Sequence, residues 1–156
     1  SKQVSKYSNI AIMKMKIYHC IHVRRGDKLN LKECPGVNKK TRPEYIKKYL
    51  LKYISKGENL YVMSNEKEPN YFKPLENIFN LFTYQDFPEF ATLIQADNYL
   101  LFSVENEIMK HAKTKIKTFK EQGYLSLLQY PPTGKVYYKS KIIRKLVSLL
   151  KPINSL

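Results

Sequence analysis

A short, strongly apolar run at residues 17–23 (IYHCIHV) is the feature that most constrains how this chain folds. Such a run predicts a strand that is buried on both faces, because a strand with one face in water alternates apolar and polar residues. Strands of this kind occur in parallel sheets that helices cover. The run ends abruptly in the motif RRGDK at residues 24–28, so fixed positive charge stands at the end of a buried strand.

The rest of the chain alternates between strand and helix patterns and contains no internal repeat. Residues 59–64 (NLYVMS) predict a second strand, and residues 76–84 (ENIFNLFTY) carry a third short apolar run. Residues 114–119 (TKIKTF) predict a short, half-exposed fourth strand. Strands that alternate with helices indicate βαβ units, with helices on both faces of a parallel sheet. The predicted fold class is therefore α/β with a Rossmann-like parallel sheet.

Three helices are expected between and after these strands. The first begins with a capping-box spacing at Thr41 and ends near Gly57, where a left-handed residue belongs. The second begins at Asp97 as its N-cap and continues to about residue 113. The third is an amphipathic basic helix over residues 139–151.

The length of 156 residues fits one domain with one hydrophobic core. We expect residues 1–8 to be a loose basic lead-in and residues 9–156 to form a Rossmann-like domain. The N-terminus has neither an initiator Met nor the apolar core of a signal peptide, and no run approaches the ~20 apolar residues of a membrane span. We therefore expect the chain to be part of a longer protein.

The charge balance is strongly basic, with 28 Lys and Arg residues against 13 Asp and Glu residues and a formal net charge of +15. A field of this sign attracts phosphates and polyanions but does not specify a fold. Together with 13 tyrosines it keeps open a basic nucleic-acid-binding or phosphate-binding module without catalysis. Nucleic-acid binding lacks further support, since the sequence has no zinc-finger spacing or RNP-like aromatic cluster. A third class, a membrane-surface protein, rests on the predicted helix at residues 139–151.

Two adjacent arginines, Arg24 and Arg25, follow the first predicted strand at the edge of the sheet where α/β proteins bind ligands. The planar guanidinium stays charged and matches phosphate oxygens with two parallel hydrogen bonds. Gly26 allows a sharp turn, and Asp27 is placed to orient a guanidinium. Two interpretations stay open: a site that stabilises a departing diphosphate, and an ion pair between Asp27 and an arginine with no ligand.

The motif HVRRGDK at residues 22–28 resembles the first conserved motif of the GDP-fucose-dependent fucosyltransferases. These are the α-1,6-fucosyltransferases and the protein O-fucosyltransferases, including the plant O-fucosyltransferase-like group. The resemblance implies the C-terminal, Rossmann-like half of a GT-B enzyme, with the N-terminal half absent from this chain. It further implies inverting transfer of fucose from GDP-fucose to a glycan or protein hydroxyl in the Golgi or another secretory lumen. An isolated half is expected to be inactive.

The resemblance also implies roles for individual residues. In the later segment SVENEIMKHAKTKIKTF, an acidic residue seven positions before Ala112 contacts guanine or ribose, although the family usually has Asp where this chain has Glu. The roles that carry over are a β-phosphate contact at Arg24, a nucleotide contact at His22, a supporting shell of Arg25, Asp27 and Lys28, a guanine or ribose contact at Glu105, and a phosphate contact at Thr118 beside Phe119.

Glu33 follows the arginines closely and is a candidate base for deprotonating an acceptor hydroxyl. It lies one residue later than the glutamate proposed for that role in the α-1,6 enzymes, and a solvated loop glutamate stays the simpler interpretation. No Asp-x-Asp pair stands in the sequence and the three histidines are dispersed, so no metal is expected. Cys20 is expected in the core strand, and Cys34 is either a free thiol or paired with a cysteine outside this chain.

Overall fold

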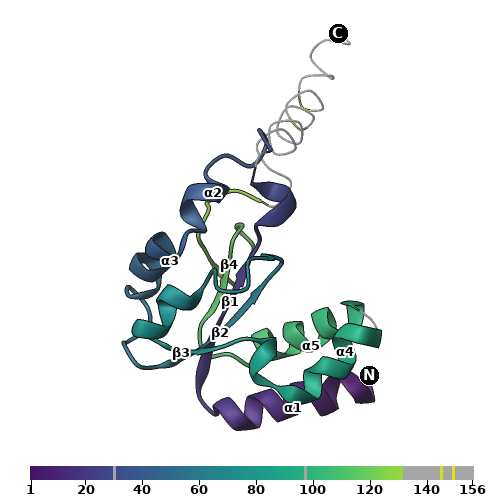
Figure 1. Ribbon diagram of the computed structural model, residues 1–156. Helices are drawn as coiled ribbons and strands as arrows, with labels where there is room; N and C mark the ends of the chain where they lie inside the picture. The colour runs from purple at the N-terminus through teal and green to yellow at the C-terminus, as the bar shows by residue number, and fades with distance from the viewer. Residues whose placement is uncertain (30, 97, 132–144, 146–148, 150–156) are drawn as a thin grey trace.

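A computed structural model describes residues 1–29, 31–96, 98–131, 145 and 149. Within these residues the fold is α/β, a five-stranded parallel sheet flanked by helices (Figure 1). The strands stand in the order β3-β2-β1-β4-β5, as in Rossmann-like sheets. Their bounds are β1 (Tyr18–Val23), β2 (Asn59–Ser64), β3 (Asn80–Phe82), β4 (Lys115–Lys117) and β5 (Leu125–Ser126). The predicted α/β class and parallel sheet are confirmed.

Strand β1 lies at the centre of the sheet and pairs with β2 on one side and β4 on the other. Val23 stands opposite Ser64, and His22 stands opposite both Met63 and Lys117. After β1 the chain builds the sheet outward through β2 and β3, and it then returns to the other side of β1 as β4. The direction of winding therefore changes between β1 and β4.

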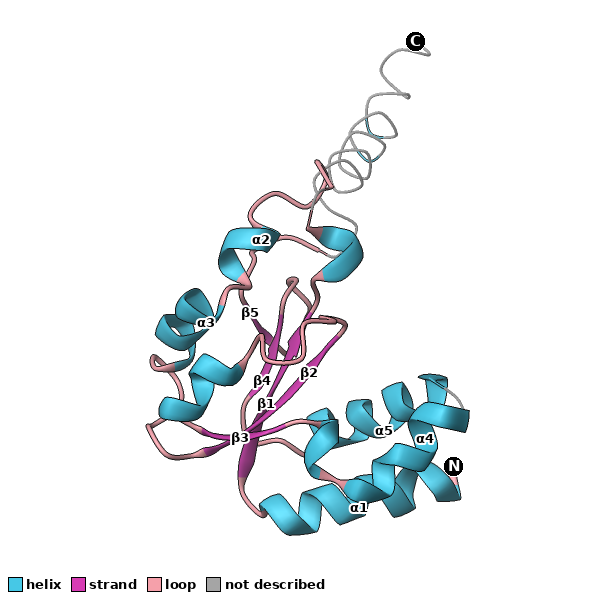
Figure 2. Ribbon diagram, in the orientation of Figure 1, coloured by secondary structure: helices cyan, strands magenta, loops and turns pink. Residues whose placement is uncertain are grey.

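Helices cover both faces of the sheet (Figure 2). One face carries α1 (Lys2–Met15), α4 (Ala91–Ala96) and α5 (Asn98–Lys110), and the other carries α3 (Pro43–Leu50) and the 3-10 helix η2 (Lys73–Asn77). The helix α2 (Val37–Lys40) packs beyond the carboxyl end of the sheet, where Val37 contacts Phe119 and Leu128. Three further 3-10 helices are η1 (Gly26–Lys28), η3 (Tyr84–Asp86) and η4 (Pro88–Phe90).

Alternate residues of the central strands enter two separate cores, because successive strand side chains point to opposite faces. Cys20 and Tyr61 belong to the core under α1, α4 and α5. Ile21 and Val62 belong to the core under α3 and η2. This confirms that the apolar run before the arginines is a strand buried on both faces, although Ile17 is 71% exposed and the strand begins at Tyr18.

The N-terminal segment is a helix, so the predicted loose lead-in at residues 1–8 is wrong. Helix α1 has Ser1 as its N-cap, whose hydroxyl accepts a hydrogen bond from the Val4 amide at 3.2 Å. Ala11 and Met15 on its inner side are fully buried in the core that α5 shares. A helix of this length is marginal alone and is stabilised by packing, which composition does not reveal.

The helix predicted to begin at Thr41 begins instead after Arg42, with Pro43 at its first position. Thr41 is the C-cap of the preceding helix, and its hydroxyl donates to the Val37 carbonyl rather than capping the next helix. Helix α3 ends at Leu50, while Gly57 has the expected positive φ of 83° in the turn before β2. Thr41, which the capping-box spacing predicted as the start of α3, therefore ends the short helix α2 instead.

The remaining predicted elements agree with the structure in type. Helix α5 and strand β4 lie within the predicted segments, whereas β5 falls in a stretch that the sequence patterns left unassigned. The predicted N-cap, Asp97, lies outside the described residues. So does the basic helix predicted over residues 139–151, apart from Lys145 and Leu149. None of the helices in the described ranges is long and apolar enough to cross a membrane.

Candidate functional site

A small pocket opens where the carboxyl ends of β1 and β4 meet. In open α/β sheets the crevice at such a change of winding is where ligands bind, because neighbouring loops leave in opposite directions. The pocket has a volume of ≈ 130 Å³, which is several times the ≈ 30 Å³ that one water molecule occupies in the liquid. It is lined by His22, Arg24, Lys28, Lys117, Thr118, Phe119 and Glu121.

Thr118 fastens the two strand ends together. Its hydroxyl accepts a hydrogen bond from the Arg24 amide at 2.7 Å and donates one to the His22 carbonyl at 3.0 Å. The Thr118 amide also donates to the same carbonyl at 3.1 Å. A hydroxyl has one hydrogen to give, and here that hydrogen is engaged. Thr118 therefore positions the backbone of Arg24, and it retains no donor for the phosphate contact expected from the resemblance.

The Arg24 guanidinium is held at the mouth of the pocket by Asp27. Its Nη2 lies 3.1 Å from one carboxylate oxygen and its Nε lies 3.4 Å from the other. Asp27 also accepts a hydrogen bond from the side-chain Nδ2 of Asn65 at 3.3 Å, and Lys28 Nζ lies 3.9 Å from its carboxylate. The ion pair foreseen as an alternative is thus present. It uses two of the five guanidinium N–H donors, so the other three stay available to a ligand.

His22 lines the same pocket as an uncharged imidazole. Burial, followed by the positive charges of Lys117 and Arg24, lowers its pKa to about 4, although Glu121 acts in the opposite direction. Its ring makes an edge contact with Phe102 of α5, with the ring centroids 6.4 Å apart. The positive potential that disfavours a charged imidazole favours an anion in the same place.

Lys117 and Glu121 belong to the pocket, and sequence reasoning did not identify either. Lys117 Nζ lies 2.6 Å from a Glu121 carboxylate oxygen and 4.2 Å from the centroid of the Tyr124 ring. Phe119 is 6% exposed and packs edge-on against Tyr130 at 5.8 Å between centroids. The signal for Lys117 is the pairing of β4 with β1, which sets it opposite His22 and is not visible in the sequence.

Arg25 points away from the pocket into a buried polar network. Its Nε donates to a Glu66 carboxylate oxygen at 2.6 Å and its Nη1 donates to the Thr41 hydroxyl at 2.6 Å. The Tyr71 ring stacks on the guanidinium at 4.2 Å. Arg25 is only 6% exposed, so it joins β1 to the loop after β2 and to α2. Arg25 therefore does not line the pocket, and its supporting role in nucleotide binding stays a prediction.

Gly26 permits the turn that separates the two arginines. Its φ is +44°, in the left-handed region that other residues rarely adopt. A Cβ at this position would lie 2.9 Å from Nδ2 of Asn65, the side chain that also accepts a hydrogen bond from the Arg25 amide at 2.7 Å. The backbone conformation therefore favours glycine, and a Cβ at this position would also force the Asn65 side chain to shift.

None of the three acidic residues proposed for the site lines the pocket, and only Asp27 contacts a residue that does. Glu105 is 7% exposed on α5, where it accepts a hydrogen bond at 2.8 Å from the hydroxyl of Tyr61 in the middle of β2. Burial raises its pKa to about 7, partly offset by that hydrogen bond. Glu33 is half-exposed in the loop between η1 and α2. The structure thus brings together His22, Arg24, Lys28 and Thr118, and it does not bring Glu105 or Glu33 to them.

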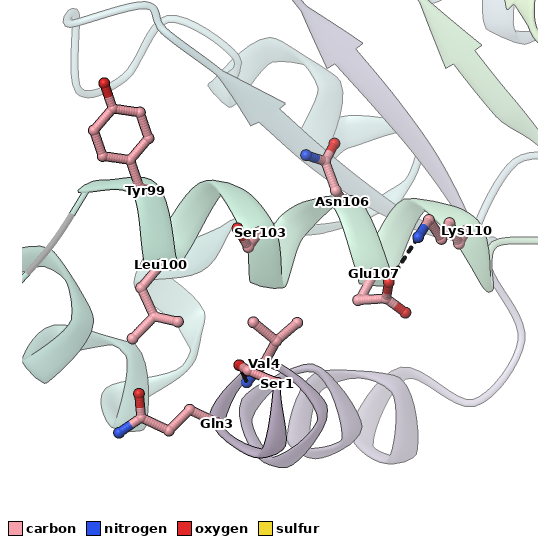
Figure 3. Close-up of a pocket in the computed structure, with 9 residues that line it drawn as sticks. All are labelled: Ser1, Gln3, Val4, Tyr99, Leu100, Ser103, Asn106, Glu107 and Lys110. Carbon is pink, nitrogen blue, oxygen red and sulfur yellow. Dashed lines mark hydrogen bonds and ion pairs between the residues drawn. The ribbon is translucent and has the colours of Figure 1, made fainter.

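A larger hollow, of ≈ 610 Å³, lies between α1 and α5 (Figure 3). Its lining is mostly neutral, and its two charged side chains, Glu107 and Lys110, form an ion pair at 2.8 Å. None of its lining residues comes from the carboxyl ends of β1 and β4, where Rossmann-like sheets bind ligands. Size alone therefore does not identify the site. The smaller pocket is the better candidate, because cationic side chains line it at the carboxyl ends of the strands.

No known protein-family model and no curated protein sequence matches this chain. Within residues 1–29, 31–96 and 98–131, no group of three or more His, Cys, Asp or Glu side chains is arranged to hold a metal ion. The two cysteines, Cys20 and Cys34, are buried free thiols, the first in β1 as expected. The site must therefore be interpreted from its own geometry.

Proposed function

We propose that this chain binds the diphosphate of GDP-fucose and forms the nucleotide-sugar half of a GT-B glycosyltransferase. The observation that carries the proposal is the convergence of Arg24, Lys28 and Lys117 on an uncharged His22, where the winding of the sheet changes. The same strand end carries the HVRRGDK motif, which resembles that of the GDP-fucose-dependent fucosyltransferases.

The size of the pocket defines which part of the donor it would hold. Sites for whole drug-sized ligands measure roughly 300–1,000 Å³, so ≈ 130 Å³ accommodates a phosphate group or a diphosphate and not a complete nucleotide sugar. The nucleoside and the sugar would then lie outside the pocket, along the edge of the sheet. In the resembled family a second Rossmann-like domain forms the other wall of that crevice.

The proposed chemistry is displacement at the anomeric carbon with inversion. An acceptor hydroxyl of a glycan or protein attacks the carbon, and the bond from that carbon to the β-phosphate oxygen breaks with its electron pair passing to the phosphate. A base takes the hydroxyl proton, a role for which Glu33 stays a sequence-based candidate. Arg24, Lys28 and Lys117 stabilise the charge that develops on the departing diphosphate, because their positions are set before the reaction begins. No metal is required in this scheme.

The location of such an enzyme would be the Golgi or another secretory lumen, as in the resembled family. The chain by itself is proposed to bind GDP without turning over GDP-fucose. Base selection is not assigned to Glu105, because its carboxyl group is buried against Tyr61. Competition among GDP, ADP and UDP tests the guanine preference independently of that residue.

Isothermal titration calorimetry of the chain with GDP tests the proposal directly. Arg24→Ala removes charge-assisted hydrogen bonds that are typically worth ~1.5–3 kcal/mol, so the dissociation constant should rise roughly tenfold to a hundredfold. Lys6→Ala is the control, since Lys6 is an exposed cation on α1 that lines neither this pocket nor the one beside Arg42. The control should bind GDP as the parent chain does.

Two results would contradict the proposal. An equal loss of affinity in Arg24→Ala and Lys6→Ala would mean that GDP responds to net charge rather than to the pocket. Absence of GDP binding in the parent chain, with tight and salt-sensitive binding to single-stranded RNA, would support the nucleic-acid-binding class instead.

A further inference from the structure

A second basic region lies along α3, on the face of the sheet opposite α1 and α5, and extends to α2 beyond the carboxyl end of the sheet (Figure 1). Residues 39–56 contain seven cationic side chains and one acidic one, Glu44. We call the cationic set the α2–α3 basic face: Lys39, Lys40, Arg42, Lys47, Lys48, Lys52 and Lys56.

The cations of this face lack acidic partners. Within the described residues none of the seven forms an ion pair, whereas Arg24, Lys28 and Lys117 in the pocket all lie within 4 Å of a carboxylate. On α3 the buried residues are Pro43, Ile46 and Leu50, so the helix turns Lys47 and Lys48 to solvent. Uncompensated charge of one sign on one surface attracts a surface of the opposite sign.

Apolar side chains are exposed in the middle of this charge. Leu51 is 37% exposed and Tyr53 is 49% exposed, at the end of α3 beside Lys52. Tyrosine is enriched where proteins meet the headgroup region of a membrane, because its ring is apolar and its hydroxyl is polar. Exposed apolar groups ringed by lysines are the combination by which proteins attach to anionic lipid surfaces.

A pocket within the face adds a place for one phosphate-bearing group. It has a volume of ≈ 240 Å³ and lies against α2 and the start of α3. Its lining combines three cations with one carboxylate and one ring: Lys39, Arg42, Lys48, Glu44 and Tyr45. Basic pockets can bind lipid headgroups, and the surrounding lysines carry the charge that an anionic bilayer attracts.

Single-stranded nucleic acid fits the same surface less well. Base stacking needs open ring faces, but Tyr45 and Tyr49 pack against the core, and Lys40 and Lys52 lie over their rings at 5.8 and 5.9 Å. Six of the seven cations are lysines, and nucleic-acid recognition favours the planar fork of arginine. Tyr53 is the most exposed of these three tyrosines, at 49%, but its ring also contacts that of Tyr49, with the centroids 5.3 Å apart.

We propose that the α2–α3 basic face binds the surface of an anionic phospholipid membrane, with Leu51 and Tyr53 at the headgroup boundary and one headgroup phosphate in the pocket beside Arg42. Membrane contact through this face is independent of the diphosphate pocket, which uses different side chains at the carboxyl ends of β1 and β4. The attraction is electrostatic and therefore weakens as ionic strength rises.

Co-sedimentation with vesicles tests this inference. The chain should bind vesicles of phosphatidylcholine mixed with phosphatidylserine and should not bind vesicles of phosphatidylcholine alone. Each lysine near an anionic surface contributes about a fivefold gain in affinity, so Lys47→Gln, Lys48→Gln and Lys52→Gln together should weaken binding roughly a hundredfold. The matched control replaces Lys2, Lys6 and Lys16, three exposed lysines in or next to α1, with glutamine and changes the net charge equally.

The control triple variant and Arg24→Ala should both retain vesicle binding, while Arg24→Ala loses GDP. Failure of the GDP proposal and failure of the membrane inference are thus separate results. Leu51→Ser with Tyr53→Ser should weaken vesicle binding and leave its salt dependence unchanged.

Three outcomes would overturn the inference. The first is equal binding to neutral and anionic vesicles, and the second is an equal loss in the two triple variants. The third is displacement from vesicles by a soluble competitor. Displacement by inorganic phosphate would indicate a free-phosphate site, and displacement by a single-stranded RNA oligonucleotide, abolished by Tyr53→Ser, would indicate a nucleic-acid surface.

Discussion

Arg24 and Arg25 are neighbours in the sequence, yet they belong to two regions with different roles. The Arg24 side chain is 43% exposed, pairs with an exposed carboxylate and faces the pocket between β1 and β4. The Arg25 side chain is 8% exposed and is surrounded by Glu66, Thr41 and Tyr71 on the other side of the strand. The pleat of the strand and the turn at Gly26 send them apart. One arginine is available to a ligand, and the other holds the strand end in place.

The largest expected difference between the two arginines concerns stability. Arg25→Ala leaves Glu66, whose side chain is 15% exposed, without its partner. Breaking a fully buried ion pair typically costs ~3–5 kcal/mol, and this partly buried pair should approach the lower end of that range. Arg24→Ala breaks an exposed pair and should cost about 1 kcal/mol or less. Urea denaturation of both variants measures the difference. Similar free energies of unfolding for the two would contradict the assignment of Arg25 to a structural network.

Replacement of Arg25 and Glu66 together sharpens this test. Arg25→Met combined with Glu66→Met removes both charges and keeps apolar volume, so it should recover most of the stability lost in Arg25→Ala. A double variant as unstable as the single one would mean that Thr41 and Tyr71, rather than the ion pair, determine the cost.

The second prediction concerns the pocket on the Arg24 side. Lys117→Gln should weaken GDP binding by ~1.5–3 kcal/mol if Lys117 contacts the diphosphate, because hydrogen bonds to charged groups are worth about that much. Glu121→Gln should strengthen binding, since it removes the only carboxylate that lines the pocket within the described residues. Calorimetry of both variants with GDP measures the pair. The two variants should change GDP affinity in opposite directions. Changes in the same direction would exclude a direct electrostatic role for Lys117 and Glu121 in GDP binding.

A third prediction tests the turn that sends the arginines apart. Gly26→Ala should destabilise the fold by about 1–2 kcal/mol, the cost of placing a side chain in the left-handed region, and more where Asn65 must move. Gly57→Ala is the matched control, because its φ is +83° and a Cβ there would meet nothing within 4 Å. In thermal unfolding, Gly26→Ala should have a lower melting temperature than Gly57→Ala. Equal losses would show that the contact with Asn65 does not matter.

The smallest predicted effect is the pH dependence of His22. Its pKa of about 4 lies below the ordinary value of 6.5, so the unfolded chain binds a proton at a pH where the folded chain does not. The contribution of His22 to stability is therefore complete above pH 6.5 and is lost as pH falls toward 4. Between about pH 7 and about pH 5.5, the parent chain should lose about 1 kcal/mol more than His22→Asn.

Glu105 changes stability with pH in the direction opposite to His22, over an overlapping pH range. It therefore serves as an internal comparison. Its pKa is raised from 4.5 to about 7, so the folded chain binds the extra proton. The contribution of Glu105 to stability is complete below pH 4.5 and is lost as pH rises toward 7. Urea denaturation between pH 4.5 and 7 measures the free energy of unfolding. Compared with the parent chain, this free energy should fall more steeply with rising pH in His22→Asn and less steeply in Glu105→Gln. Parallel curves for both variants would contradict the positions assigned to these two groups.

Local pattern was sufficient for the main elements of the fold. The apolar run before the arginines, the segment NLYVMS and the inner face of α5 at Val104 and Ile108 are determined by short-range periodicity, which burial then enforces. The position of Arg24 at a ligand edge also followed from the chain alone, because a parallel sheet binds ligands at the carboxyl ends of its strands.

Only the tertiary structure decided which side chains meet there. Lys117 lies 89 positions or more after the motif residues and reaches the pocket through the pairing of β4 with β1. Glu105 and Thr118 stand at the expected spacings in the sequence. In the structure, however, the Glu105 carboxyl group is hydrogen-bonded to Tyr61, and the Thr118 hydroxyl is hydrogen-bonded to the backbone at the junction of β1 and β4. The spacing of residues in the sequence does not reveal these strand and side-chain partners. Strand order and side-chain partners depend on which apolar faces pack against one another in the folded chain. Residue type and spacing determined the candidates, and burial determined which of them a ligand can reach.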